Sequence, residues 1–236
     1  RNALGPSDMR SALALLHAGP DGVVPQARWE SPTLCRANDV AFFEDGLIVT
    51  LDRGACGGLG VIIENVFALP RGAVAFASAD GVRTLAAGYL VPNGVRVVDS
   101  PDGRWLAIAE TRERRVLWTP LGDALAIDRA NEIATPLDGA PDNLTPAPGG
   151  VLATTHDDLP RLALHRSARG WFDPPGGKVW RLRPPNADGA PEPELLLAIP
   201  GDLYAGPTAA AMGARVLAVG SATESAILVC PAPRSG

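Results

Sequence analysis

Short apolar runs alternate with clusters of turn residues along most of the chain. The runs have the length of β-strands, and their apolar positions rarely recur at the three- and four-residue spacing of a helix. Gly and Pro are spread throughout and mark the turns between runs. The pattern predicts an all-β chain with strands at 12–18, 39–43, 46–52, 73–78, 82–88, 94–99, 105–110, 115–121, 150–156, 178–185, 193–199, 206–212, 215–221 and 226–231.

Four segments of the chain repeat one pattern. Each has a polar or small start, a short strand, a turn containing Gly, a second strand and a small-residue end. The segments start at Asn38, Asn93, Asn143 and Gly206. A repeat of roughly 40 to 50 residues with about four strands is typical of β-propeller blades. Loop insertions are expected to lengthen some units, at 53–72, 122–141 and 157–177.

The repeat predicts a β-propeller of four-stranded blades, forming a single domain over residues 1–236. A hairpin at 10–34 forms part of a partial leading blade, and the predicted units are 1–37, 38–92, 93–141, 142–205 and 206–236. Six blades need about 250 to 300 residues. We therefore expect a six-bladed type whose N-terminal blades are missing from this sequence. A ring of four or five blades and an open sandwich are the alternatives.

Composition and charge narrow the classes of partner. The chain has 236 residues, of which 46% are hydrophobic and 20% charged, and its net charge is -5. This acidity argues against nucleic acid as a partner, because nucleic-acid binders usually present a basic face. No apolar run is long enough to span a membrane. Oligomeric state is not indicated.

Two features bear on processing and compartment. The sequence begins with Arg1, not Met, so we expect it to be processed or to lack N-terminal residues. The three cysteines, Cys35, Cys56 and Cys230, match no zinc-binding or redox spacing. Small buried side chains are the favoured interpretation of Cys35 and Cys56. The compartment stays open, with a secreted or periplasmic location favoured over a cytoplasmic one.

The starts of the repeats carry the candidate chemistry. The first strand of each propeller blade lines the central channel, so residues at its start gather around one axis. Three repeats place oxygen-bearing side chains there: Asn38–Asp39, Asn93 and Asp142–Asn143. Carboxylate and amide oxygens are ligands of hard cations such as Ca²⁺. The fourth repeat, at Gly206, has no such ligand, which fits an open side for a substrate.

A turn is the competing interpretation of these residues. Asn and Asp side chains hydrogen-bond to the nearby backbone and are common in turns. For any one of these residues taken alone, a turn is the favoured interpretation. Because such residues occur at the same position in three repeats, a metal-binding site is favoured for the set.

Four segments resemble one known family: "LCRANDVAFF", "GVRTLAAGYLVPNGVRVVDSPDGRWLAIAET", "PDNLTPAPGGVLATTHD" and "LYAGPTAAAMGARVLAVGSATESAILVC". They are similar to the calcium-dependent paraoxonase/arylesterase family, from about residue 10 to Cys230. That family belongs to a superfamily of six-bladed propellers that includes gluconolactonases and strictosidine synthases. The Asn-Asp, Asn-Gly and Asp-Asn motifs occur in the family's order.

The resemblance implies an activity and residue roles. Asn38, Asn93, Asp142 and Asn143 would bind a catalytic calcium, and Asp39 a second, structural calcium. The activity would be hydrolysis of lactones and aryl esters, in which water attacks the carbonyl and calcium stabilises the oxyanion. A further acidic ligand, a histidine general base and the cysteine partner of Cys230 would lie upstream of this sequence.

His156, in "TTHDD", is the candidate catalytic residue within the sequence. It matches a family histidine near the pocket and could contact substrate or transfer a proton, because the unperturbed pKa of histidine lies near neutrality. A simple loop histidine is the alternative.

Two other functions stay open. The first is a gluconolactonase-like hydrolase of sugar lactones. The second is a propeller that acts as a non-catalytic binding module, which applies if the chain is complete as given. In every enzymatic case the partner is a small-molecule lactone or ester.

Overall fold

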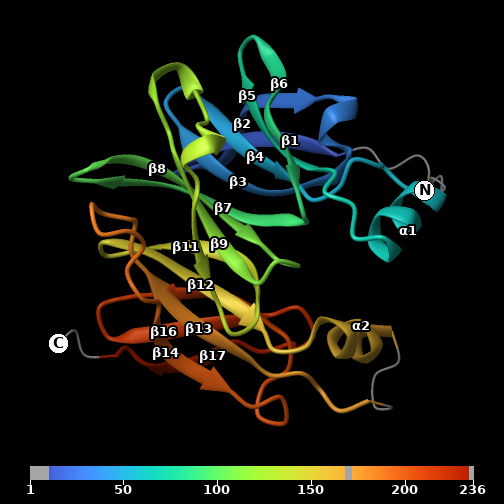
Figure 1. Ribbon diagram of the computed structural model, residues 1–236, viewed down its shortest axis with the longest axis vertical. Coiled ribbons are helices and arrows are strands. Elements are labelled where there is room, and N and C mark those ends of the chain that lie inside the picture. The colour runs from blue at the N-terminus through green and yellow to red at the C-terminus, as the bar shows by residue number, and fades with distance from the viewer. Residues whose placement is uncertain (1–10, 168–171, 234–236) are drawn as a thin grey trace. The chain divides into compact units, whose positions relative to one another are not determined.

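The computed structural model describes residues 11–167 and 172–233. The chain forms two compact units, which divide between Pro92 and Asn93. Both are built mainly of antiparallel strands that pair with their neighbours in the sequence (Figure 1). The predicted all-β class is confirmed.

The first unit contains a hairpin and one four-stranded sheet. The hairpin consists of β1 (Ala12–Gly19) and β2 (Gly22–Glu30). The sheet is a meander of β3 (Ala37–Phe43), β4 (Gly46–Leu51), β5 (Gly72–Ser78) and β6 (Gly81–Tyr89). All residues of β4 are buried, which matches its nearly continuous apolar sequence.

A small core holds the first unit together. Its buried residues come from the 3₁₀ helix Pro32–Arg36 and from strands β4 and β5, and the hairpin packs against it: Leu34, Leu47, Val49, Leu51, Ala73 and Ala75, with Leu13 and Trp29 from the hairpin. The indole N–H of Trp29 donates to the carbonyl of Ser78 over 2.6 Å. This bond fixes the hairpin on the sheet.

The second unit contains three consecutive sheets. The first is β7 (Pro92–Ser100), β8 (Gly103–Glu110), β9 (Arg115–Pro120) and β10 (Ile133–Pro136). The second is β11 (Ala140–Ala147), β12 (Gly150–His156), β13 (Gly177–Leu182) and β14 (Glu194–Ile199). The third is β15 (Pro207–Met212), β16 (Val216–Ser221) and β17 (Leu228–Pro231). Short 3₁₀ helices at Asp123–Leu125 and Arg129–Asn131 lie between β9 and β10. Four-stranded meanders of this kind are the blades of the predicted propeller class.

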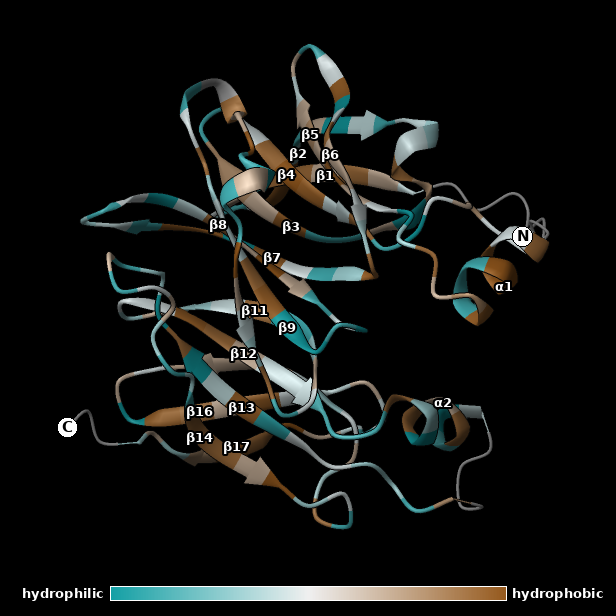
Figure 2. Ribbon diagram, in the orientation of Figure 1, coloured by the Kyte–Doolittle hydropathy of each residue, from teal (hydrophilic) through white to brown (hydrophobic). Residues whose placement is uncertain are grey.

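Apolar residues pack between successive sheets of the second unit. Figure 2 shows the hydrophobic segments of these strands in brown. One core joins the β7–β10 and β11–β14 sheets, with Trp118 and Leu144 fully buried in it. A second joins the β11–β14 and β15–β17 sheets through Leu152, Leu217 and Val219. Face-to-face packing therefore orders these three blades.

Two helices lie in segments expected to be loop insertions. Helix α1 (Gly58–Val66) follows β4 and has no buried residue, and α2 (Leu159–Ser167) follows β12 and buries Leu162. Each has only nine residues, which is too short for a clear helical period to emerge from the sequence. None of the described helices is long and apolar enough to cross a membrane.

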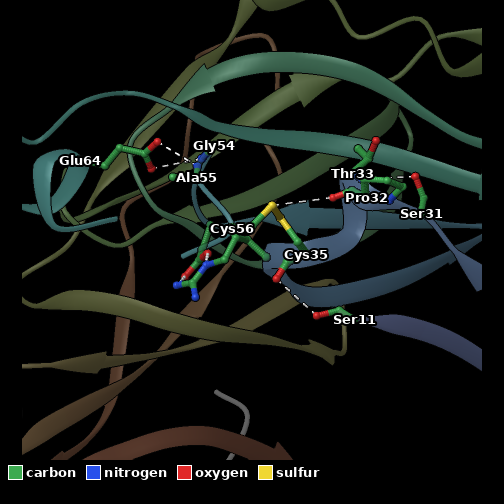
Figure 3. The surroundings of a disulfide bond; sticks show 11 residues. Ser11, Ser31, Pro32, Thr33, Cys35, Gly54, Ala55, Cys56 and Glu64 are labelled. Atoms are coloured by element: carbon green, nitrogen blue, oxygen red, sulfur yellow. Dashed lines mark hydrogen bonds and ion pairs between the residues drawn. A yellow bond between two sulfur atoms is a disulfide. The ribbon is translucent and has the colours of Figure 1, made fainter. Parts of the chain in front are cut away.

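Cys35 and Cys56 form a disulfide, which corrects their interpretation as small buried side chains (Figure 3). Their Cα atoms are 5.3 Å apart, a normal separation for a bridged pair. The bond ties the helix Pro32–Arg36, which leads into β3, to the loop after β4. Glu64 fastens the same loop by accepting hydrogen bonds from the backbone N–H groups of Gly54 and Ala55, at 3.2 and 2.9 Å.

Candidate metal-binding and catalytic site

Two of the candidate ligand pairs lie in β-bulges at the same place in their sheets. In the first unit Ala37 pairs with Leu51 and Val40 with Val49, so Asn38 and Asp39 together oppose Thr50. In the second unit Pro141 pairs with Thr155 and Leu144 with Ala153, so Asp142 and Asn143 together oppose Thr154. A bulge places one extra residue in a strand and re-aims its side chains.

The bulges exclude the turn interpretation of these pairs. Asn38–Asp39 lies inside β3, and Asp142–Asn143 lies inside β11. A third register shift, between Pro207 and Ala209 in β15, occurs at the corresponding position of the last sheet and leaves Thr208 as the extra residue. The polar residues that recur at the start of the repeats therefore coincide with a backbone irregularity that recurs in the sheets.

Both carboxylate oxygens of Asp142 are held by neighbouring side chains. The amide nitrogen of Asn93 donates to Oδ1. Nε2 of His156 lies 3.1 Å from Oδ2. Asn93 comes from the start of β7 and His156 from the end of β12. Two strands from different sheets thus fix the orientation of a single carboxylate.

Asn143 is oriented by the third sheet of the second unit. Its Nδ2 donates to the backbone carbonyl of Thr208, in the β15 irregularity, over 3.1 Å. Because an amide that donates through its nitrogen presents its oxygen on the opposite side, Asn93 and Asn143 both offer Oδ1 as the atom for a cation.

Gly94 permits the close approach of β7 to the bulge of β11. A Cβ at this position would lie 2.3 Å from the backbone nitrogen of Leu144 and 2.8 Å from the carbonyl oxygen of Asp142. Real Cβ contacts are not this short, so only glycine fits without movement of one strand. The small residue after Asn93 therefore brings that side chain within reach of Asp142.

Asn38 and Asp39 lie in the first unit, whereas the second unit holds Asn93, Asp142, Asn143 and His156. Asn38 is exposed and Asp39 is half-buried. Asp39 Oδ1 accepts a hydrogen bond from the backbone N–H of Val40 over 2.8 Å. The backbone N–H of Asp39 donates to Thr50 Oγ1 over 3.1 Å, which closes the bulge.

Asp157, which follows His156, is engaged by a lysine. Its Oδ1 lies 2.5 Å from Nζ of Lys178, and Asp138 Oδ2 lies 3.3 Å from the same nitrogen. Burial alone would lower the pKa of the Lys178 ammonium, but the hydrogen bonds and charges of Asp157 and Asp138 outweigh it and raise that pKa. Asp157 therefore forms an ion pair with Lys178 next to the candidate ligands.

Thr154 also lies next to the candidate ligands and was not among the predicted site residues. It is fully buried opposite the bulge of Asp142–Asn143, and its Oγ1 has no hydrogen-bond partner among residues 11–167 and 172–233. Thr50 occupies the same position opposite Asn38–Asp39. Aligning the second strands, "LIVTLD" and "VLATTH", places Thr50 against Thr154 and would have found both threonines.

The donor set of the second unit is rich in amides and poor in charge. No group of three or more His, Cys, Asp or Glu suited to a metal occurs in the part of the chain that the structure describes. Asp142 contributes the one carboxylate among the four contacting candidates, beside the two asparagine amides. Carboxylate and carbonyl oxygens are what calcium accepts, whereas zinc favours nitrogen and sulfur. The residues present therefore fit calcium better than a transition metal.

Comparisons with known proteins address the family and the fold. A family model described as Arylesterase matches residues 56–230. Among solved structures, a luciferin-regenerating enzyme is similar with a TM-score of 0.53 and 17% identity, over 93% of this chain and 68% of that one. A calcium-binding protein, regucalcin, from Agrobacterium tumefaciens gives a TM-score of 0.46 and 17% identity, over 93% of this chain and 66% of that one. No curated protein matches the sequence.

Proposed function

Because the chain belongs to the arylesterase family, we propose that it is a calcium-dependent hydrolase of lactones and aryl esters. The family match covers most of the chain and confirms the resemblance found in its motifs. As a member of this family the chain is an ester or lactone hydrolase. The calcium ion, the substrate preference and the residue roles are the finer parts of the proposal.

The observation that carries the proposal is the arrangement around Asp142. Its two carboxylate oxygens each accept one hydrogen bond, from Asn93 and from His156. A carboxylate offers about four lone-pair sites, so each oxygen keeps one for a cation. The amide oxygens of Asn93 and Asn143 supply two further candidate ligands. Their orientation by protein acceptors reduces the entropy lost when an ion binds.

Within the second unit the proposed ligands of the catalytic ion are Asp142, Asn93 and Asn143. Asn38 and Asp39 lie in the equivalent bulge of the first unit, and the ligand roles that the resemblance implies for them stay predictions. Calcium takes six to eight oxygen ligands, so water and substrate oxygens would fill the remaining positions.

A calcium ion bound here would polarise the substrate carbonyl and stabilise the negative charge that develops on its oxygen. The chain contributes ligand side chains that are held in fixed orientations. Asp142, Asn93 and Asn143 hold fixed positions because each is bonded to a second strand. A water molecule attacks the carbonyl carbon, the bond to the ring or aryl oxygen breaks, and that oxygen receives a proton.

Calcium titration of the chelated chain tests the proposal. We expect saturable calcium binding by calorimetry, and calcium-dependent hydrolysis of phenyl acetate and of a long-chain acyl lactone. D142A should lose both, with a fall in kcat/KM of about 100-fold or more. D188A is the matched control, because Asp188 is an exposed loop residue outside the site.

Two results would contradict the proposal. The first is an absence of calcium binding by the wild-type chain, or binding that D142A leaves unchanged. The second is hydrolysis that proceeds at the same rate after chelation. Hydrolysis of gluconolactone alone would replace the substrate class by sugar lactones.

A further inference from the structure

We infer that His156 is a positioning residue: its Nε2–H holds the carboxylate of Asp142 in the orientation that a cation requires. The inference rests on the proposed function in one respect, that calcium binds at Asp142. It assigns His156 a role different from the substrate contact or proton transfer considered from the sequence.

His156 is buried and forms a hydrogen bond with the carboxylate of Asp142. The residue ends β12 and is 3% exposed. Its Nε2 lies 3.1 Å from Oδ2 of Asp142, while Asn93 binds the other oxygen, Oδ1. With one donor on each oxygen, rotation of the Asp142 carboxylate about its terminal bond breaks a hydrogen bond. The remaining lone pairs therefore point in a fixed direction.

The surroundings of the ring select one tautomer. A carboxylate oxygen only accepts, so Nε2 of His156 must carry the hydrogen of this bond. Nδ1 is buried and has no hydrogen-bond partner in the described parts of the chain. A hydrogen on Nδ1 would be a buried donor without an acceptor, which costs more than a bare lone pair. The neutral Nε2–H tautomer satisfies both nitrogens best.

This tautomer does not suit a general base. A base needs a lone pair within hydrogen-bond reach of the attacking water. Nε2 of His156 is committed as a donor to Asp142, and Nδ1 is sealed from solvent. Hydrogen bonds to a metal-binding carboxylate are a known device for fixing ligand orientation, and their loss typically weakens metal affinity about 10–100-fold.

Two substitutions of His156 separate the roles. Gln can place an amide N–H near the position of Nε2, whereas Leu has no donor. Calcium dissociation constants of the chelated full chain are measured by calorimetry. We expect H156L to raise Kd about 10–100-fold and H156Q to stay within about threefold of wild type. H17L and H17Q, at an exposed position of β1, are the matched controls and should leave Kd unchanged.

The outcomes distinguish the inference from the proposed function. If wild type binds calcium and both His156 variants bind it equally well, while both lose kcat, proton transfer is the role and the inference is wrong. If wild type binds no calcium, the proposed function fails and the inference fails with it. Rescue by Gln but not by Leu supports positioning, since a proton-transfer role would be lost in both variants.

Nuclear magnetic resonance tests the same inference without any substitution at the site. The chain has three histidines, and long-range ¹H–¹⁵N correlation reports the tautomer of each. We expect the Nε2–H tautomer for His156 at neutral pH. A hydrogen found on Nδ1 instead would overturn the inference. This measurement decides the matter even if H156L fails to fold.

Discussion

Replacing Gly94 by Ala tests whether the close approach of β7 to β11 shapes the proposed calcium site. The new Cβ would lie 2.3 Å from the backbone nitrogen of Leu144. Nonbonded carbon contacts are favourable near about 3.5 Å, so the two strands must separate by about 1 Å. All three close atoms belong to the backbone of Asp142, Asn143 and Leu144, so no side chain can swing aside to relieve the contact.

The magnitude of the effect follows from this displacement. Overpacking of an ordered interior typically costs about 1–3 kcal/mol of unfolding free energy. A shift of about 1 Å also exceeds the roughly 0.2 Å tolerance of metal–ligand distances. Asn93 and Asp142 lie on the two strands that separate, so their hydrogen bond should be strained or lost. We expect G94A to weaken calcium binding and to lower kcat/KM by about 100-fold.

Urea unfolding followed by tryptophan fluorescence measures the stability of G94A, and calorimetry measures its calcium affinity. G122A is the matched control, because the nearest atoms to a Cβ at Gly122 are 3.7 Å away and its backbone is extended, with φ of -79°. Equal stability and equal calcium affinity for G94A and G122A would refute the close-packing argument. Lower stability with unchanged calcium affinity would refute the link between Gly94 and the site.

Three further predictions concern the stability of the fold. Reducing the Cys35–Cys56 disulfide, whose sequence separation is 21, should lower the unfolding free energy by about 3 kcal/mol in urea, and an equal midpoint with and without reductant would contradict this. The single O–H of Tyr204 lies within hydrogen-bond reach of two backbone carbonyls, those of Val219 and Ala226, so Y204F should cost about 1–3 kcal/mol in the same assay. Burial raises the pKa of this hydroxyl, so absorbance titration should show it ionising above pH 10.0. Despite its partial burial, Lys178 has a pKa that Asp157 raises above 10.5, so the pairing stabilises the fold below that pH and is lost as pH rises through the folded-state value. K178M should remove this alkaline loss, seen as a smaller fall in unfolding free energy between about pH 10 and pH 12, and a fall equal to that of wild type would count against the assignment.

Most of the sheet strands could be predicted because their apolar runs are short and bounded by turns. The run at 46–52 corresponds to β4 (Gly46–Leu51), and the run at 150–156 to β12. The hairpin predicted at 10–34 corresponds to β1 and β2, but its second strand could not be given bounds, since most residues of β2 are exposed and its sequence alternates weakly. Strand β10 has four residues, too few for a pattern. A strand buried in a sheet has a recognisable apolar run in its sequence, whereas an exposed hairpin strand has none.

The positions of the candidate site residues within the repeats could be predicted from the sequence, but their geometry could not. Matching positions in the repeats identified Asp142–Asn143 and Asn38–Asp39. Whether such a pair lies in a turn or in a bulge depends on one extra residue relative to the neighbouring strand, which a single sequence does not display. The bond between His156 and Asp142 depends likewise on strand register. The Cys35–Cys56 pairing needed the distance between the 3₁₀ helix Pro32–Arg36 and the loop after β4, which sequence separation does not supply.

The order of strands within the sheets has a consequence for how the chain acquires its structure. In each four-stranded sheet every strand pairs only with strands adjacent to it in the sequence, so one sheet is a single continuous segment such as Pro92–Pro136. Contacts of short sequence separation close at low entropic cost and form early. Each sheet can therefore assemble as soon as its own segment has left the ribosome, and a damaging substitution in one sheet need not delay the formation of those synthesised before it.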